Sequence, residues 1–382
     1  MPEQELRIEV LLEEVIKRRA SDLHIQVGLP PMLRIDGTLI AIAGFDALDE
    51  AQVESLVFAI LDEDQQQILL KDKEFDFSFA FGTLGRFRVN AFHERGNLAA
   101  ALRLIPNEIK SVTELGMPPV VMNFADYPRG LVLVTGPTGS GKSTTLAALV
   151  DKINSEKSQH IITIEDPIEF THKSKKSVVV QREVHYDTYS FSAALRSSLR
   201  QDPDVVLIGE MRDLETISAA ITIAETGHLV FATLHANNAN QAIDRIIHFF
   251  EADRHGQLFM DLSLNLRAII AQQLIPTPDG KGRRAAIEIL LGTQLIADYI
   301  RKGEIHEIKP VMKRSRDIGM QTFDQALFDL YENGEITYAD AIKHADSPND
   351  LRLQIKLESK HAKNGDLDEG ANKLSIDLTD YT

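Results

Sequence analysis

Gly136-Pro-Thr-Gly-Ser-Gly-Lys-Ser143 is the stretch of this 382-residue sequence that decides its fold. It follows four apolar residues at 131–134 and precedes a helical pattern at 144–150. A loop of the form G-x-x-x-x-G-K-[ST] between a strand and a helix binds the phosphates of a nucleotide, whereas the same string outside that context is a chance match. The sequence therefore predicts a phosphate-binding loop inside an α/β domain.

The residue types in this loop suit a polyphosphate. Glycines allow backbone N–H groups to approach the phosphate oxygens, and the start of the following helix adds positive potential. Lys142 can reach the β and γ phosphates, and the hydroxyl of Ser143 can ligate Mg²⁺. We therefore predict that ATP and Mg²⁺ bind at Gly136, Pro137, Thr138, Gly139, Ser140, Gly141, Lys142, Ser143 and Thr144.

Two later apolar runs end in carboxylates, which a P-loop enzyme needs to organise Mg²⁺ and to orient the attacking water. One run leads into Glu165, Asp166 and Glu169, and another leads through a glycine into Glu210. We assign Glu210 to the magnesium shell, together with Ser143, and Glu165 to the water. For Asp166 and Glu169 the alternative is a solvated strand end in which the carboxylates cap helices.

Two histidines bracket the strand predicted at residues 229–234. Histidine can sense a γ-phosphate as a neutral donor or as a charged partner. We therefore predict that His228 and His235 take part in catalysis. Hydrogen-bonded structural histidines are the alternative, which would leave both residues without a chemical role.

Residues 85–90 alternate as a strand, so Arg86 and Arg88 lie on one face and Phe87 and Val89 on the other. Exposed arginines are usually only solvated. In a ring, however, an arginine of one subunit or domain can reach the γ-phosphate held by another, and such a residue raises the rate by ~10³ to 10⁵.

Composition excludes several classes of protein. The formal charge of −16 argues against a broad nucleic-acid-binding face, because phosphate neutralisation needs clustered Lys and Arg. The absence of cysteine excludes disulfides, thiolate zinc sites and cysteine nucleophiles. No apolar run approaches the ~20 residues that span a bilayer, and the acidic start does not resemble a signal peptide, so we expect a cytoplasmic protein.

The patterns along the chain predict an α+β domain first and an α/β domain after it. Residues 5–19 show the apolar spacing of a surface helix, residues 75–79 alternate as a strand, and Asp36-Gly37 marks a tight turn. After a proline-punctuated stretch, apolar runs separated by helical patterns indicate buried parallel strands joined by crossover helices. The runs are 131–134, 161–164, 205–208 and 229–233. From about residue 260 we expect mostly helix, with residues 261–274 the clearest example.

Six motifs in this order resemble the secretion-superfamily ATPases of type IV pili and, within them, the retraction motors PilT and PilU. The motifs are residues 20–24, 85–92, 136–143, 162–169, 207–213 and 228–235. The resemblance implies a PAS-like domain at 1–105, a linker at 106–119, a RecA-like ATPase domain with a helical C-terminal part at 120–357, and a flexible acidic tail at 358–382. It also implies a homohexameric ring, with Glu165 as catalytic carboxylate, Glu210 as the Walker B residue, and Arg88 and Arg103 as the arginines that approach nucleotide.

Several segments are more similar to PilU than to PilT, namely 234–240, 246–250, 252–257 and 261–266. The C-terminal signature Ala-Ile-Arg-Asn-Leu-Ile-Arg-Glu of PilT is replaced by Gln-Leu-Ile-Ala-Asp-Tyr-Ile-Arg-Lys at 294–302. The resemblance therefore implies a motor that reinforces a PilT-like partner and acts through the platform protein PilC, on the cytoplasmic face of the inner membrane at the pilus base.

Three other functions compete with retraction. Pilus-assembly and type II secretion ATPases share the core, but their usual four-cysteine zinc site cannot form in a chain without cysteine. A DNA or RNA translocase is disfavoured by the acidic balance and by the lack of a basic, aromatic-rich stretch. An adaptor that binds nucleotide without hydrolysing it is disfavoured by the complete loop and the two carboxylates.

Overall fold

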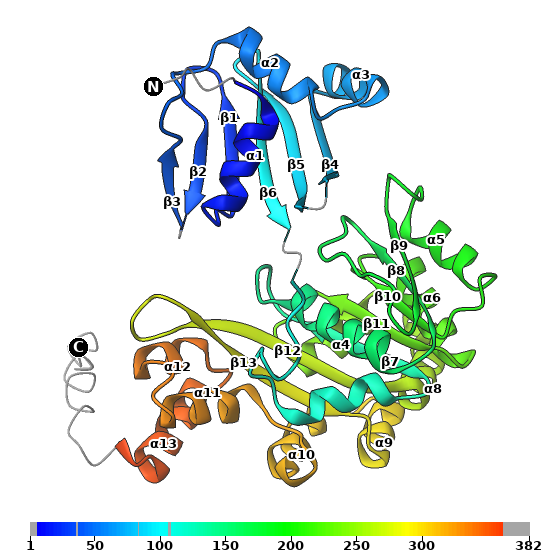
Figure 1. Ribbon diagram of the computed structural model, residues 1–382. Helices are drawn as coiled ribbons and strands as arrows, with labels where there is room; N and C mark the ends of the chain where they lie inside the picture. Colours follow the sequence, from blue (N-terminus) through cyan, green and yellow to red (C-terminus); the bar gives the residue numbers. More distant parts are fainter. Residues whose placement is uncertain (1–5, 36, 83, 106–107, 362–382) are drawn as a thin grey trace, which may run out of the picture. The chain divides into compact units, whose positions relative to one another are not determined.

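The computed structural model describes residues 6–35, 37–82, 84–105 and 108–361, which form two compact units (Figure 1). The first unit comprises Met1–Ile109 and Glu165–His172, and the second comprises Lys110–Ile164 and Lys173–Thr382. Among the helices of these described ranges, none is long and apolar enough to cross a membrane.

The first unit is a six-stranded antiparallel sheet with helices packed against it, in the order β3-β2-β1-β6-β5-β4. Its elements are α1 (Ile8–Lys17), β1 (Asp22–Gln26), β2 (Met32–Ile35), β3 (Thr38–Ala41), α2 (Glu50–Phe58), α3 (Glu63–Asp72), β4 (Glu74–Phe81), β5 (Gly85–Glu94) and β6 (Asn97–Ile105). The predicted helix is α1, whose Leu11, Leu12 and Val15 are buried. Strands β2 and β3 pair with Ile35 opposite Thr38, as expected for a tight turn between them, whereas Asp36 of the predicted turn lies outside the described residues. The α+β prediction for this region is confirmed, whereas its PAS-like character stays a prediction.

The second unit is built on a seven-stranded sheet in the order β13-β12-β7-β11-β10-β8-β9. Its strands are β7 (Gly130–Thr135), β8 (His160–Glu165), β9 (Val178–Glu183), β10 (Val205–Ile208), β11 (Leu229–Leu234), β12 (Leu266–Pro276) and β13 (Arg283–Leu291). All four predicted apolar runs are adjacent parallel strands, since β12, β7, β11, β10 and β8 pair in parallel. The predicted α/β sheet is therefore confirmed.

Helices cover both faces of this sheet, which explains why its central strands are buried at every position (Figure 1). Leu131 and Leu133 of β7 face the core beneath α6 (Leu214–Glu225) and α7 (Ala239–His248). The alternate residues Val132 and Val134 face a second core beneath α4 (Lys142–Glu156). The remaining elements in this part are η1 (Pro119–Asp126), α5 (Phe191–Ser198), η2 (Ala252–Arg254) and α8 (His255–Asn265).

The predicted helix at residues 261–274 is wrong over most of its length. Helix α8 ends at Asn265, and β12 begins at Leu266 and pairs with β7 on one side and β13 on the other. Residues 268–272 are all buried, so the apolar run has no exposed side from which a period could be read. A continuous apolar run fits a buried helix and a buried strand equally well, and the tertiary pairing decides between them.

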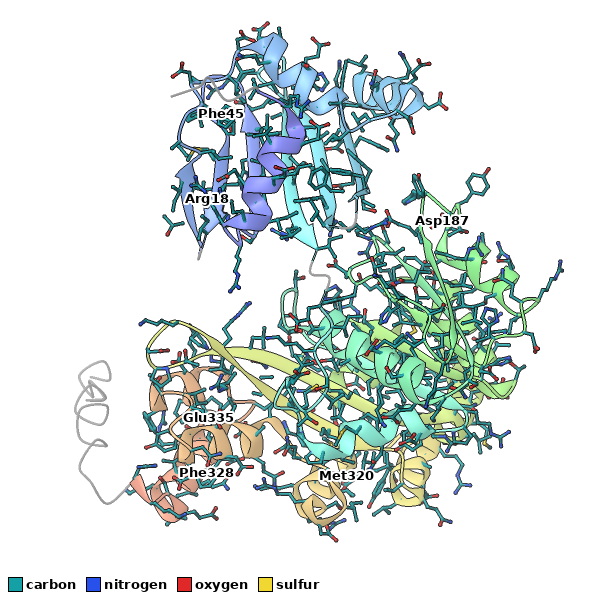
Figure 2. The ribbon with its side chains drawn as sticks, in the orientation of Figure 1. Arg18, Phe45, Asp187, Met320, Phe328 and Glu335 are labelled. Atoms are coloured by element: carbon teal, nitrogen blue, oxygen red, sulfur yellow. The ribbon has the colours of Figure 1, made fainter. Side chains whose placement is uncertain are left out.

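The helical C-terminal part begins after β13; its first helices pack against α8, and its later helices pack on β12 and β13. It comprises α9 (Gln294–Lys302), η3 (Ile305–Glu307), α10 (Ile308–Arg314), η4 (Arg316–Ile318), α11 (Phe323–Glu332), α12 (Tyr338–His344) and α13 (Pro348–Glu358). Phe328 packs against the small core that these helices share with the strands, and Glu335 accepts a 2.6 Å hydrogen bond from Arg284 of β13 (Figure 2).

Two predicted boundaries fall differently in the structure. Residues from Lys110 onward belong to the second unit, and Val112 and Met117 are buried in its core, so much of the proposed linker is packed. Ser359 donates a hydrogen bond to Glu332, which ties the start of the proposed tail to α11. The rest of that tail, residues 362–382, lies outside the described residues.

A buried carboxylate joins the helical part to the rest of the second unit. Glu288 of β13 is 1% exposed and accepts hydrogen bonds from the first backbone N–H of two helices, Ala239 of α7 at 2.8 Å and Phe323 of α11 at 3.2 Å. Burial raises the pKa of Glu288 to about 7, although the Ala239 N–H opposes this. The two hydrogen bonds therefore offset only part of the cost of burying the charged carboxylate, while each helix end gains a buried partner.

Replacing Glu288 with glutamine should flatten the pH dependence of stability. An unfolded glutamate releases its proton near pH ~4.3, whereas folded Glu288 keeps it to about pH 7, so the folded state binds the extra proton between these values. The contribution of Glu288 to the free energy of unfolding therefore falls as pH rises through this window, by on the order of 3 kcal/mol. Urea unfolding of both proteins at several pH values measures the difference. Parallel curves for the two proteins would contradict the assignment.

Candidate nucleotide-binding site

The phosphate-binding loop lies at the carboxyl edge of the sheet, between β7 and the first residue of α4, Lys142. Gly136 has φ +148°, and a Cβ on it would lie 2.3 Å from the backbone oxygen of Gln272. Gly141 has φ +90°, and a Cβ there would lie 2.9 Å from the side-chain amide nitrogen of Gln272. Only glycine allows this loop to pass so close to β12.

Gln272 of β12 holds the loop to the first turn of α4. Its side chain is 2% exposed; the amide donates to the backbone oxygen of Ser140 at 2.6 Å, and its oxygen accepts from the hydroxyl of Thr145 at 2.8 Å. On the other side of the loop, the hydroxyl of Thr135 donates to the backbone oxygens of Leu234 and Ala236, each at 2.8 Å. Strands on both sides therefore fix the loop before any ligand binds.

Lys142 is held above its own loop. Its ammonium group donates to the backbone oxygens of Gly136 at 3.0 Å and Pro137 at 3.1 Å. Burial lowers the pKa of Lys142 below its ordinary value, and the charge of Glu210 offsets part of this effect. A half-buried ammonium beside a carboxylate at this position suits binding of the β and γ phosphates.

Glu210 follows β10, two residues after Ile208, and forms a charged cluster with residues from neighbouring segments. One carboxylate oxygen lies 3.0 Å from Nε2 of His235, and the other lies 2.7 Å from the guanidinium of Arg212. The backbone N–H of Met211 donates to Thr233 of β11 at 2.9 Å, which fixes the segment that carries Glu210 against the strand that carries His235. The structure therefore brings Lys142, Glu210 and His235 to one edge of the sheet.

The oxygen donors at this edge fit Mg²⁺. Magnesium is bound by one or two protein oxygens together with substrate phosphates and water, not by a cage of protein ligands. The described residues contain no group of three or more His, Asp or Glu side chains that could hold a metal alone. Ser143 and Glu210 are the residues that would hold the ion, which would neutralise charge on the phosphates.

Glu165 is the last residue of β8, and Ile164 before it pairs with Ile208 of β10. Its backbone therefore belongs to the same edge of the sheet as the segment that leads to Glu210. The Glu165 carboxylate accepts a 3.3 Å hydrogen bond from the backbone N–H of Glu169. Its role in orienting water stays a prediction.

The structure does not bring His228 to this edge. In the parallel pairing of β11 with β7, Leu229 lies opposite Gly130 and Leu234 opposite Thr135, so His228 precedes the strand and His235 follows it. The His228 ring lies 3.0 Å from the backbone oxygen of Ile223, a local contact. Within one chain, therefore, only His235 reaches the loop, and alternation of apolar residues could not distinguish the two.

The predicted arginines lie in the first unit. Arg86 and Arg88 share a face of β5 while Phe87 and Val89 are buried, as the alternation predicts. Arg88 lies 3.8 Å from Glu169, which belongs to the same unit. Arg103 donates to Asp22 at 2.8 Å. Burial would raise the pKa of Asp22, but hydrogen bonds from Ser21 and Arg103 outweigh it and lower that pKa.

The sequence analysis missed Gln272, Thr145 and Arg212. A signal existed for Gln272, because an amide inside a long apolar run of a strand must find hydrogen-bond partners when it is buried. Its partners lie 127 and 132 residues away in the chain, so they could not be named from local pattern. Arg212 and Thr145 carry no comparable signal.

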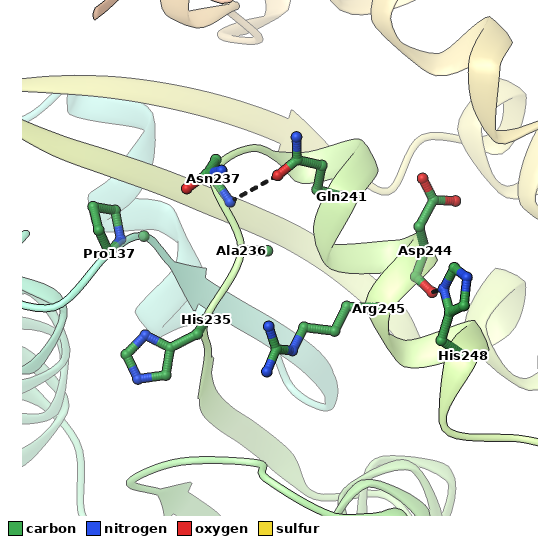
Figure 3. A pocket seen from close by; sticks show the side chains of 9 residues that line it. Pro137, His235, Ala236, Asn237, Gln241, Asp244, Arg245 and His248 are labelled. Atoms are coloured by element: carbon green, nitrogen blue, oxygen red, sulfur yellow. Dashed lines mark hydrogen bonds between the residues drawn. The ribbon is translucent and has the colours of Figure 1, made fainter.

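A cavity of about 480 Å³ opens beside the loop (Figure 3). Its walls include Gly136 and Pro137 from the loop, His235 after β11, and Gln241, Arg245 and His248 from α7. The cavity therefore begins where the loop and the Glu210–His235 pair meet.

A parallel sheet with a phosphate loop after one strand, and a carboxylate and a histidine after the neighbouring strands, defines a P-loop nucleotide-binding protein of the α/β class. The type II/IV secretion system protein family matches residues 3–344. The chain belongs to this family, and within it to the retraction ATPases that include PilT and PilU.

Three comparisons support this membership. The chain is 51% identical to the type IV pilus ATPase PilU of Pseudomonas aeruginosa over 98% of each chain. It is 48% identical to the PilT retraction ATPase of the same organism, over 88% of this chain and 98% of that protein. A crystal structure of the pilus retraction motor PilT with bound ADP superposes with a TM-score of 0.87 at 45% identity, covering 91% of this chain and 100% of the other.

Replacing Lys142 with alanine should lower ATP turnover by at least ~100-fold, because the loop loses the ammonium group that neutralises the β and γ phosphates. Steady-state phosphate release measures this effect. Lys152→Ala is the matched control, since Lys152 lies on the same helix and pairs with Glu156 one turn away. Equal turnover of Lys142→Ala and the control would refute the site.

Replacing Gln272 with leucine should weaken nucleotide binding by about tenfold. The substitution keeps the size of the side chain but leaves the Ser140 carbonyl unpaired, at a cost of ~1–3 kcal/mol when buried, and leaves the Thr145 hydroxyl only its weak 3.7 Å contact with the Met117 sulfur. Titration with a fluorescent ADP analogue gives the affinity. Gln273→Leu changes the neighbouring, half-buried residue and should bind as the wild type does; the same loss in both variants would assign the effect to the strand and not to the loop.

Proposed function

We propose that this chain is a motor ATPase that hydrolyses ATP with Mg²⁺ and drives or reinforces retraction of type IV pili. The observation that carries the proposal is the meeting of Lys142, Glu210 and His235 at the edge of a P-loop sheet. Similarity to PilU and PilT along nearly the whole chain supports the choice of retraction among the activities of the family.

In this proposal each group has a separate task. The loop amides and Lys142 bind the phosphates, and Ser143 and Glu210 hold the magnesium ion, which lowers the charge that opposes attack. Glu165 orients the attacking water and accepts its proton. His235 responds to the terminal phosphate through its contact with Glu210, which lies at 3.0 Å.

The proposed assembly is a homohexameric ring with a PAS-like N-terminal domain and a RecA-like ATPase domain. Arg88 and Arg103 then approach a nucleotide bound by another subunit or domain, where an arginine adds ~10³ to 10⁵ in rate. Arg103 would first have to leave Asp22, with which it forms a 2.8 Å ion pair. In this proposal His228 contributes only if it contacts a nucleotide that is bound by the loop of another subunit.

The proposed setting is the cytoplasmic face of the inner membrane at the pilus base, where the chain associates with the membrane only through partners. The features shared with PilU favour action together with a PilT-like ATPase and through the platform protein PilC. No nucleic acid takes part. Pilus assembly or type II secretion is the second candidate, since those ATPases share the core.

Deleting the gene separates retraction from assembly. Retraction predicts that cells keep surface pili but lose twitching motility or force, whereas an assembly motor predicts loss of the pili themselves. Expression of the wild type should restore motility, and expression of the Lys142→Ala variant should not. Deletion in strains with and without the PilT-like ATPase measures dependence on that partner. Full motility and normal pili in every strain would overturn the proposal.

A further inference from the structure

Arg245 is an exposed cation in the wall of the cavity beside the phosphate loop. In Figure 3 its guanidinium end extends toward His235, while the carboxylate of the preceding residue, Asp244, points the other way. Across the described ranges, the structure gives the Arg245 side chain no hydrogen bond or ion pair.

Three other polar side chains in the cavity wall already have partners. The ring of His235 contacts Glu210 at 3.0 Å, and Nδ1 of His248 lies 2.6 Å from the backbone oxygen of Asp244. The amide oxygen of Gln241 accepts from the backbone N–H of Asn237 at 3.2 Å. Asp244 also lines this space, but its carboxylate points away from His235 in Figure 3, so the charge directed toward the loop is that of Arg245.

Helix α7 holds Arg245 in a defined place. The side chain of Asn238 caps the helix by accepting from the backbone N–H of Gln241 at 2.9 Å, and buried Glu288 accepts from Ala239 at 2.8 Å. One face of the helix is buried in the core through Ala242, Ile243 and Ile246, and Arg245 projects from the side of the helix next to that face. A side chain on an anchored helix is better positioned for a ligand than one on a loop.

We propose that the cavity is an oxyanion site in which Arg245 binds a phosphate group of the nucleotide. The group is either the γ-phosphate of ATP before cleavage or the inorganic phosphate released after it. A guanidinium binds phosphate through two parallel hydrogen bonds, and Gly136 and Pro137 in the same wall place the site next to the terminal phosphate. This inference rests on the proposed ATP hydrolysis and adds a residue to it.

The test compares wild type, Arg245→Gln, Arg245→Lys and a control, Arg200→Gln. Arg200 is an exposed arginine of the same unit outside this cavity. For each protein, with Mg²⁺, we would measure affinity for ADP, affinity for a non-hydrolysable ATP analogue, ATP turnover, and inhibition by inorganic phosphate. The ADP affinity shows whether the loop is intact.

If Arg245 binds the γ-phosphate, Arg245→Gln should bind the ATP analogue about tenfold more weakly while ADP affinity stays within twofold of the wild type. If it binds the released phosphate, the variant should instead lose inhibition by phosphate at unchanged analogue affinity. Arg245→Lys should retain part of the affinity that Arg245→Gln loses, because lysine keeps the positive charge but cannot form the bidentate hydrogen bonds. The control should match the wild type.

The inference is overturned if wild type hydrolyses ATP and Arg245→Gln matches it in analogue affinity, turnover and phosphate inhibition. It is also overturned if ADP and analogue affinities fall equally, since that would assign Arg245 to the folding of the loop. If wild type itself does not bind or hydrolyse ATP, the proposed function fails first. A folding defect in Arg245→Gln is detected by thermal unfolding, and Arg245→Lys then provides the comparison.

Discussion

The second unit depends on the close approach of β12 to the start of the phosphate loop. A single Cβ at Gly136 would overlap the backbone oxygen of Gln272, and the Gln272 side chain bonds both the loop and the first turn of α4. A loop whose backbone amides must point at a ligand cannot use them to stabilise itself. The neighbouring strand supplies that support, and this allows a glycine-rich segment to keep one conformation.

The order of the strands determines which side chains meet at this edge of the sheet. Because β11 lies between β7 and β10, a residue that follows β11 lies between the phosphate loop and the carboxylate that follows β10. His235 occupies that position and contacts Glu210 directly. In the proposed function, this contact would carry a change in the charge of a bound phosphate to His235 and from there to α7, which begins a few residues later.

Helix α7 connects this edge to the helical C-terminal part through Glu288, which accepts hydrogen bonds from the starts of α7 and α11. A carboxylate with nearly complete burial is retained here because two helix N-termini would otherwise lose a buried partner. The position of Arg245 in the cavity depends on the same anchor. The nucleotide site and the distal helices are therefore parts of one packed unit and are joined through the buried carboxyl group of Glu288.

The sequence alone determined the loop, the four parallel strands around it and the family, because these rest on local features: glycine and lysine at set spacings, and apolar runs of strand length. It also placed Arg86 and Arg88 on one face of a strand by simple alternation. Only the tertiary structure decided that residues 266–276 form a strand. It also decided that His235, and not His228, lies beside the phosphate loop, and that the Gln272 side chain donates a hydrogen bond to that loop. Each of these three outcomes depends on which distant segments pair. The local sequence of a buried apolar run, or of a single polar residue within it, does not identify the segment that it contacts.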